Sequence, residues 1–151
     1  MLKKFIAGAL LVAGGLASLS AQSNDRLDEL LAQAQARLDS TAYLLMVSGG
    51  LLSEDTEPAA AFDAAVAAGF LSKTRHPEDG VSLEDLSFLV MKALKLPGGL
   101  EWMLLPSPRA AYRELSFQKI INTSAGPRRL IAGDEAVRTV GAAAALKGGR
   151  S

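Results

Sequence analysis

Three side chains with binding chemistry stand close together in the second half of this 151-residue sequence. Tyr112 and Arg113 follow Arg109 by three and four residues, a spacing that places all three on one side of a helix. Guanidinium groups beside an aromatic ring suit a carboxylate, a phosphate or an acidic glycan. The competing interpretation is that Tyr112 belongs to the core while both arginines pair with acidic residues in the first half of the chain.

Catalytic chemistry has few candidates in this sequence. It contains no cysteine and one histidine, which excludes thiolate ligands, disulfides and a multi-histidine metal centre. His76 stands in a polar loop, and no motif ties a nucleophile to it. The string from Ser116 to Lys119 resembles the Ser-x-x-Lys of penicillin-recognising enzymes, but no Ser-Asp-Asn string accompanies it. We therefore expect no enzyme, no metal and no cofactor.

The first 21 residues have the order of a secretory signal peptide. Lys3 and Lys4 come first, residues 5–19 carry no charge, and small residues end at Ser20 and Ala21. Because a membrane span takes about 20 apolar residues, cleavage is expected rather than retention as an anchor. The predicted cut after Ser20 or Ala21 leaves a mature chain without a membrane span, located in the periplasm or outside the cell.

Beyond the signal segment, the two halves of the chain carry opposite charge. Residues 22–90 contain four basic and twelve acidic side chains, whereas residues 91–151 contain ten basic and four acidic ones. The two halves are expected to attract each other, and the alternative is a basic surface for an anionic partner. Nucleic acid is not expected as that partner, because the chain has an export signal and no basic motif interleaved with aromatic residues.

Apolar residues at steps of three and four predict a single amphipathic helix over residues 25–47. Gly49 and Gly50 are expected to end this helix, and residues 53–58 to form an acidic linker. We expect the helix to pack on its own domain; the alternative is self-association through residues 25–47. The apolar series is Leu27, Leu31, Ala34, Leu38, Ala42 and Leu45.

A pattern of helix, polar loop and helix occurs twice, fifty residues apart. Helices are expected at residues 60–68 and 110–118, and each is followed by a loop and by a second helix. The second helices start at Ser82 and near Ala132. Under the fifty-residue shift, Phe62 matches Tyr112, Pro77 matches Pro127, and Val81 matches Ile131.

The predicted fold is therefore all-α. Residues 22–58 supply the amphipathic helix and the linker, residues 59–145 a tandem helix-loop-helix domain, and residues 146–151 a flexible tail. Neither helix of a unit can bury its apolar face alone, so the units are expected to pack together as one small domain.

Short sequence signals predict where individual helices start and which residues turn toward the core. Ser82 and Asp85 have the spacing of a capping box, and Ser107 before Pro108 is a helix start signal. The triplets at 69–71 and 119–121 are expected to turn inward where each first helix ends. Trp102 and Met103, in the connector at 96–108, are expected in the core or in a lid over it.

Residues 81–94, from Val-Ser-Leu-Glu-Asp-Leu to Met-Lys-Ala-Leu, resemble the second helix of S-layer homology modules, which begins Ile-Thr-Arg-Ala-Glu-Phe-Ala. Residues 64–71 are similar to the first helix of that family and its Gly-Ile-Ile turn. The resemblance implies non-covalent attachment to cell-wall polysaccharide, with Asp85 and Glu135 at the acidic motif position. Leu83 and Gly133 replace the arginine of the motif.

Taken together, the sequence predicts an exported, non-enzymatic protein of the bacterial envelope that acts as a structural or protein-interaction module. Its partner is expected to be an envelope protein or an anionic wall glycan. The alternative function is binding of wall polysaccharide or peptidoglycan in the manner of S-layer homology modules. The candidate ligand-binding residues are Arg109, Tyr112, Arg113, Asp85 and Glu135.

Overall fold

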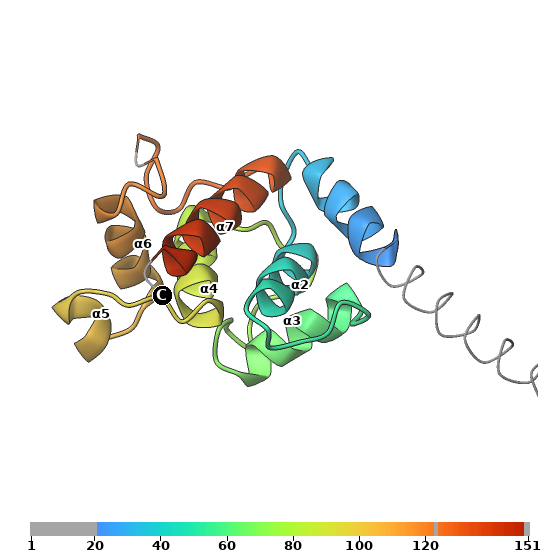
Figure 1. The fold of residues 1–151 in the computed structure, drawn as a ribbon, viewed down its shortest axis with the longest axis horizontal. Coiled ribbons are helices and arrows are strands. Elements are labelled where there is room, and N and C mark those ends of the chain that lie inside the picture. Colours follow the sequence, from blue (N-terminus) through green and yellow to red (C-terminus); the bar gives the residue numbers. More distant parts are fainter. Residues whose placement is uncertain (1–20, 123, 150–151) are drawn as a thin grey trace, which may run out of the picture.

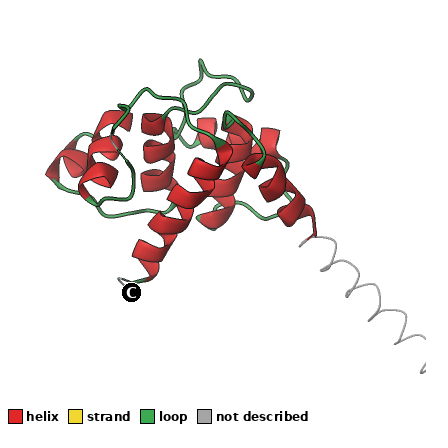
Figure 2. Ribbon diagram, turned by 90° about the horizontal axis from the view of Figure 1, so that it is seen from above, coloured by secondary structure: helices red, strands yellow, loops and turns green. Residues whose placement is uncertain are grey.

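The chain folds into helices joined by loops, which confirms the predicted all-α class (Figures 1 and 2). This computed structural model describes residues 21–122 and 124–149, so most of the predicted signal peptide, including Ser20, lies outside the described residues. Residues 21–31 are helical. The helices that follow are α2 (Leu38–Ser48), α3 (Pro58–Ala67), α4 (Leu83–Ala93), α5 (Leu100–Leu104), α6 (Pro108–Phe117) and α7 (Gly133–Gly148).

The single helix predicted over residues 25–47 is wrong, because the chain leaves the helix at residues 32–37. The physical reason lies elsewhere in the chain: the backbone of Ala36 pairs with two other loops instead of with its own helix. Apolar periodicity could not reveal this break. Leu31 and Leu38 keep helical spacing across it, although Leu31 is 41% exposed and Leu38 is fully buried.

Three backbone segments meet in a closed ring of hydrogen bonds. The Ala36 N–H donates to the Ile131 carbonyl (2.8 Å), Ile131 donates to Val81 (3.0 Å), and Val81 donates back to Ala36 (3.0 Å). None of these residues is more than 1% exposed. Each stands two residues before the first residue of α2, α4 or α7. The ring therefore joins the starts of three helices that are far apart in the sequence.

The loops before α4 and α7 also cap the starts of the earlier helices α2 and α4. The free amides at the start of α2 donate to the loop before α4: Leu38 N–H to Asp79 (3.0 Å) and Asp39 N–H to Pro77 (2.9 Å). These carbonyls satisfy donors that α2 would otherwise leave open, since its N-cap Arg37 makes no side-chain cap. The residues matched by the fifty-residue shift cap α4 in the same way. The Leu83 N–H donates to the Arg129 carbonyl (2.9 Å), and the Glu84 N–H donates to the Pro127 carbonyl (2.8 Å).

The start of α7 is capped by the chain that follows residues 21–31. The Gly133 N–H donates to the Gln33 carbonyl at 2.9 Å. Contact is so close here that a Cβ built on residue 133 would lie 1.7 Å from the carbonyl oxygen of Leu30. Glycine is required at this position for that reason. The tandem repeat itself stays a prediction, while the hydrogen bonds of the matched positions are observed.

Helix α4 lies centrally, between α2, α6 and α7 (Figure 1). Its predicted apolar face is confirmed, because every member is at most 1% exposed; the members are Leu83, Leu86, Leu89, Val90 and Leu94. Burial of a side chain of this kind contributes roughly 1.5–3 kcal/mol, so α4 is the main apolar contributor to the core. Ala42 and Leu45 of α2 are buried in the same core, as expected for a helix that packs on its own domain.

The helix caps and inward-turning triplets predicted from the sequence are present in the structure. The Ser82–Asp85 capping box and the Ser107 cap with Pro108 in the first turn are confirmed. The inward triplets are confirmed as well, since Leu71 and Ile121 are each 8% exposed.

Two boundaries were not predicted. Helix α7 continues to Gly148, past residue 146, where the predicted tail begins. The connector at 96–108 contains the short helix α5, in which Trp102 is half-buried and Met103 is 72% exposed, so the expected core or lid position fails for Met103.

One arginine ties residues 21–31 to the body of the fold. The guanidinium of Arg26 donates to the carbonyls of Glu54 (2.9 Å) and Thr56 (2.5 Å), and it forms an ion pair with Glu57 at 2.7 Å. It also lies 5.0 Å from the ring centroid of Tyr43 in α2. Because the Arg26 side chain is only 14% exposed, these contacts fix the first helix against α2 and the loop after it.

The contact at Gly133 predicts a pair of opposite mutational effects within α7. Gly133→Ala forces the start of α7 away from Leu30, and we expect a loss of about 2 kcal/mol in the free energy of unfolding. Gly141→Ala meets no atom within 4 Å, so it is expected to gain up to about 1 kcal/mol from helix propensity. Urea unfolding followed by circular dichroism measures both variants. Equal effects of the two substitutions would contradict the close approach.

Candidate functional site

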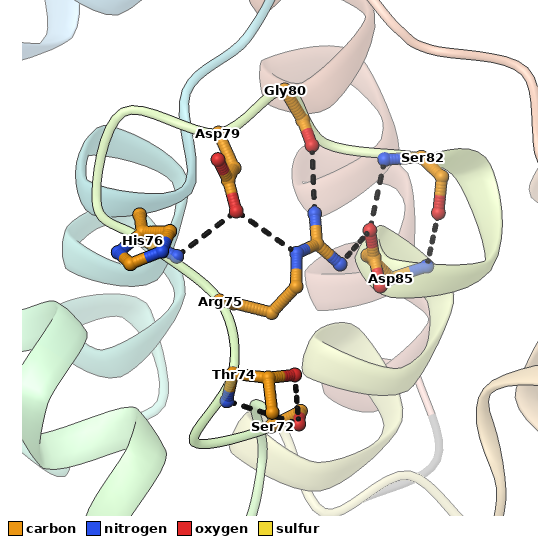
Figure 3. A network of polar contacts seen from close by, with 8 residues as sticks. All are labelled: Ser72, Thr74, Arg75, His76, Asp79, Gly80, Ser82 and Asp85. Atoms are coloured by element: carbon orange, nitrogen blue, oxygen red, sulfur yellow. Dashed lines mark hydrogen bonds and ion pairs between the residues drawn. The ribbon is translucent and has the colours of Figure 1, made fainter.

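The loop before α4 forms a polar network centred on Arg75 (Figure 3). Its guanidinium donates to the Asp85 carboxylate (2.9 Å), the Gly80 carbonyl (2.9 Å) and the Asp79 carboxylate (3.3 Å). Figure 3 shows the side chain reaching between these three acceptors. Arg75 therefore links its own loop to the first turn of α4.

Asp85 has two structural duties in this network. Its carboxylate accepts the Ser82 N–H (3.1 Å), while the Ser82 hydroxyl accepts the Asp85 N–H (3.1 Å). A carboxylate at this end of a helix is also stabilised by the helix dipole. Asp85 was predicted as a ligand-binding residue, and the structure places it against Arg75 and the start of α4.

The electrostatics of the loop are mutually stabilising. Although burial alone lowers the pKa of Arg75, its hydrogen bonds and charge pairing with Asp85, and then with Asp79, raise it above the usual arginine value. The hydrogen bond from the His76 amide (2.9 Å), reinforced by Arg75, holds the pKa of Asp79 below its usual range. His76 thus contributes its backbone N–H to this network.

A second arginine–carboxylate pair stands at the start of α7. Arg129 binds Glu135 through two parallel hydrogen bonds of 2.8 and 2.5 Å. Hydrogen bonding to Glu135 raises the pKa of Arg129 against the effect of burial, and Tyr112 contributes further. At α2, Arg37 pairs with Asp39 at 2.6 Å. All three helices that start at the ring therefore carry such a pair.

Two cavities lie at positions related by the fifty-residue shift. The smaller, of about 200 Å³, is lined by residues that include Phe70, Leu71, Ser72 and Asp85. The larger, of about 480 Å³, is lined by Ile120, Ile121, Asn122 and Glu135 at the matching positions. We call the larger one the Glu135 cleft. Its other lining residues are Ser124, Arg129, Arg138, Thr139 and Ala142.

The predicted site residues do not converge on one cavity. Asp85 lines the smaller cavity and Glu135 the larger one, while Arg109, Tyr112 and Arg113 line neither. Tyr112 packs against the core from α6, as its match Phe62 does from α3. The structure thus separates the acidic candidates from the two exposed arginines of α6.

The expected pairing of the α6 arginines with the acidic first half is wrong for Arg113. Its partner is Glu101 in α5, at 2.7 Å, on the same basic half of the chain. Arg109 is exposed and makes no hydrogen bond or ion pair with another described residue. The ion pairs of the described arginines each join two residues of the same half, so none of them bridges the two halves.

Sequence reasoning missed Arg75 and Arg26 as central residues. The capping box marked Asp85 as a fixed carboxylate, yet its arginine partner stands ten residues earlier in a loop without regular structure. Arg26 reaches Glu57 across 31 residues. Neither distance has a periodic signature, so only the fold brings these pairs together.

Two further results bear on chemistry. Within residues 21–122 and 124–149, no group of three or more histidine or acidic side chains is arranged to hold a metal ion. None of the helices in those ranges combines the length and the hydropathy that crossing a membrane requires. No protein-family model, curated protein or solved structure matches this chain, so the S-layer homology resemblance remains a prediction.

The network predicts that Arg75 matters more to stability than an exposed arginine does. Arg75→Ala leaves the part-buried Asp85 carboxylate without its ion-pair partner, and we expect a loss of about 1–2 kcal/mol in the free energy of unfolding. Arg113→Ala breaks a pair whose side chains are 56% and 53% exposed, so a loss below about 0.5 kcal/mol is expected. Chemical denaturation of both variants tests this difference, and a larger loss for Arg113→Ala would refute it.

Proposed function

We propose that this chain is an exported, non-catalytic module of the bacterial cell envelope that holds other envelope components on its surface. The observation that carries the proposal is the use made of the polar side chains. The arginine–carboxylate pairs at α2, α4 and α7 all serve to fix helix starts. Because these arginines and carboxylates stabilise helix starts, they support a structural role, and the helices that they fix can present constant surfaces to partners.

The geometry of the first helix supports export followed by processing. The predicted cut lies at Ser20 or Ala21, before the first residue that anchors the helix. Arg26, Leu30 and Gln33 make the contacts that join this segment to the body, and all three remain after the cut. Removal of the signal segment therefore leaves these contacts intact.

The second candidate function is binding of wall glycan, and the Glu135 cleft favours it. Side chains that can hydrogen-bond sugar hydroxyls or acidic groups line this cleft; they include Asn122, Ser124, Arg138 and Thr139. Arg129 is also a lining residue, and its guanidinium is held in place by two hydrogen bonds to Glu135, so the cleft wall carries a fixed charged pair. A cleft lined in this way is more suitable for an anionic polysaccharide than for an apolar ligand.

One experiment distinguishes the two functions. The full chain is expressed with its own N-terminus in a bacterium, the cell is fractionated, and the N-terminal residue of the recovered protein is determined. That protein is then sedimented with purified peptidoglycan that retains its attached polysaccharide. Both functions predict recovery outside the cytoplasm with residue 21 or 22 first. Unprocessed protein in the cytosol would contradict both.

Matched arginine variants locate any glycan binding. Arg138 lies in the cleft with its side chain 74% exposed, whereas Arg113 lies outside it with its side chain 56% exposed. Glycan binding in the cleft predicts that Arg138→Ala weakens retention about tenfold, the equivalent of one lost charged contact, while Arg113→Ala does not. If retention is lost in an Arg109→Ala, Arg113→Ala double variant but not in Arg138→Ala, the glycan-binding site lies on α6 instead of in the cleft. Absence of retention, with crosslinking to one envelope protein, would support the interaction module.

A further inference from the structure

Helix α5 lies at one end of the molecule (Figure 1), and its apolar side chains are exposed. Leu100, Met103 and Leu104 follow the spacing of one helix face, and they are 71%, 72% and 69% exposed. Leu105, directly after the helix, is 74% exposed. We call these four residues the α5 tip. Large apolar side chains gathered with such exposure are a mark of an interaction surface.

The opposite side of α5 holds the tip in place. The ring of Trp102 meets Phe88 of α4 edge-on, with 5.8 Å between the ring centroids, and Lys92 lies 5.4 Å from the Trp102 ring. At the start of α5, the Gly99 N–H donates to the Glu114 carboxylate at 2.9 Å. These contacts bind the inner face of α5 to α4 and α6. The outward direction of the four apolar side chains is therefore built into the fold.

Basic side chains flank the tip on both sides in the sequence. Lys92 and Lys95 come before it, and Arg109 and Arg113 follow it on α6, which packs against α5. Only two carboxylates, those of Glu101 and Glu114, lie in the same stretch, and both already bind neighbouring groups. An apolar tip with a surplus of positive charge around it is complementary to a lipid surface with anionic headgroups.

We propose that the α5 tip inserts into the interfacial region of a bilayer that carries anionic headgroups. The apolar side chains enter the acyl boundary, Trp102 lies at the headgroup level, and Lys95 and Arg109, which pair with no carboxylate among the described residues, face the phosphates. This inference concerns a surface separate from the Glu135 cleft and does not depend on glycan binding.

The size of the tip favours a lipid surface over a second copy of the chain. Four side chains of this type can bury on the order of 400 Å² of apolar area. Each partner in a stable protein interface buries about 800 Å². The tip alone is thus too small for a stable dimer, whereas lipid insertion needs no complementary surface.

The single tryptophan of the sequence, Trp102, gives a local probe of insertion. The full chain is mixed with vesicles of phosphatidylcholine alone, or with vesicles that also contain phosphatidylglycerol, and in both cases the acyl chains are brominated. Residues 5–19 carry no charge and can bind lipid themselves, so binding of the chain is not the readout. The readout is quenching of Trp102 fluorescence, which we expect with phosphatidylglycerol and expect to fall in high salt.

Matched variants decide the test. Met103→Glu with Leu104→Glu should reduce the quenching severalfold, and Leu51→Glu, at a leucine that is 38% exposed and outside the tip, should leave it unchanged. Met103→Gln with Leu104→Gln gives the same comparison without added charge, and circular dichroism establishes that each variant is folded. Quenching that is absent, or that survives in the tip variants, would overturn the proposal. A wild-type dimer that these variants dissociate without lipid would do the same.

Discussion

The fold depends on one constraint, the pairing of buried backbone groups where three helices begin. Ala36, Val81 and Ile131 are almost fully buried, and each places a peptide N–H and a carbonyl where water cannot reach. An unpaired group there would cost about 1–3 kcal/mol. The closed ring satisfies all three donors at once. It also fixes where α2, α4 and α7 start, and through them the apolar faces that make the core.

Each of the two matched loops caps a helix start with a proline carbonyl. The carbonyls of Pro77 and Pro127 accept amide protons from the first turns of α2 and α4, and proline retains its acceptor while it stiffens the loop. The end of the first helix takes the corresponding place at α7, where Gly133 allows it to approach. Each of the three helix starts thus relies on a segment from another part of the chain. If one of these segments failed to fold, the helix start that it caps would be left uncapped.

Sequence reasoning could predict what is local. The capping box at Ser82, the start at Pro108 and the buried face of α4 follow from spacing and residue type, and all three are present. It could not predict what distant segments impose. The break after Leu31 contains no glycine or proline that could signal it. Its cause is the hydrogen bonding of the Ala36 backbone to the two other loops, which replaces bonding within the helix. The partner of Asp85 was missed for the same reason. Net charge suggested pairing between the halves, whereas the ion pairs of the described arginines each lie within one half.

Rigid helix starts leave two surfaces available for partners: the polar Glu135 cleft and the α5 tip. They lie on different elements and differ in chemistry, one being lined by arginine and hydroxyl groups and the other by leucine and methionine. This separation suits a module that contacts more than one component of an envelope. The Arg129–Glu135 pair fixes one wall of the cleft, and the contacts of Trp102 and Gly99 fix the α5 tip.

Native-state hydrogen exchange at Ala36, Val81 and Ile131 tests the role of the ring most directly. If the ring closes the domain as one unit, the three amides should exchange with the same opening free energy, equal to that of global unfolding. Exchange at Ala36 through a smaller opening, while Val81 and Ile131 stay protected to the global limit, would show that the segment at 32–37 is peripheral. That result would contradict the dependence of the fold on the ring.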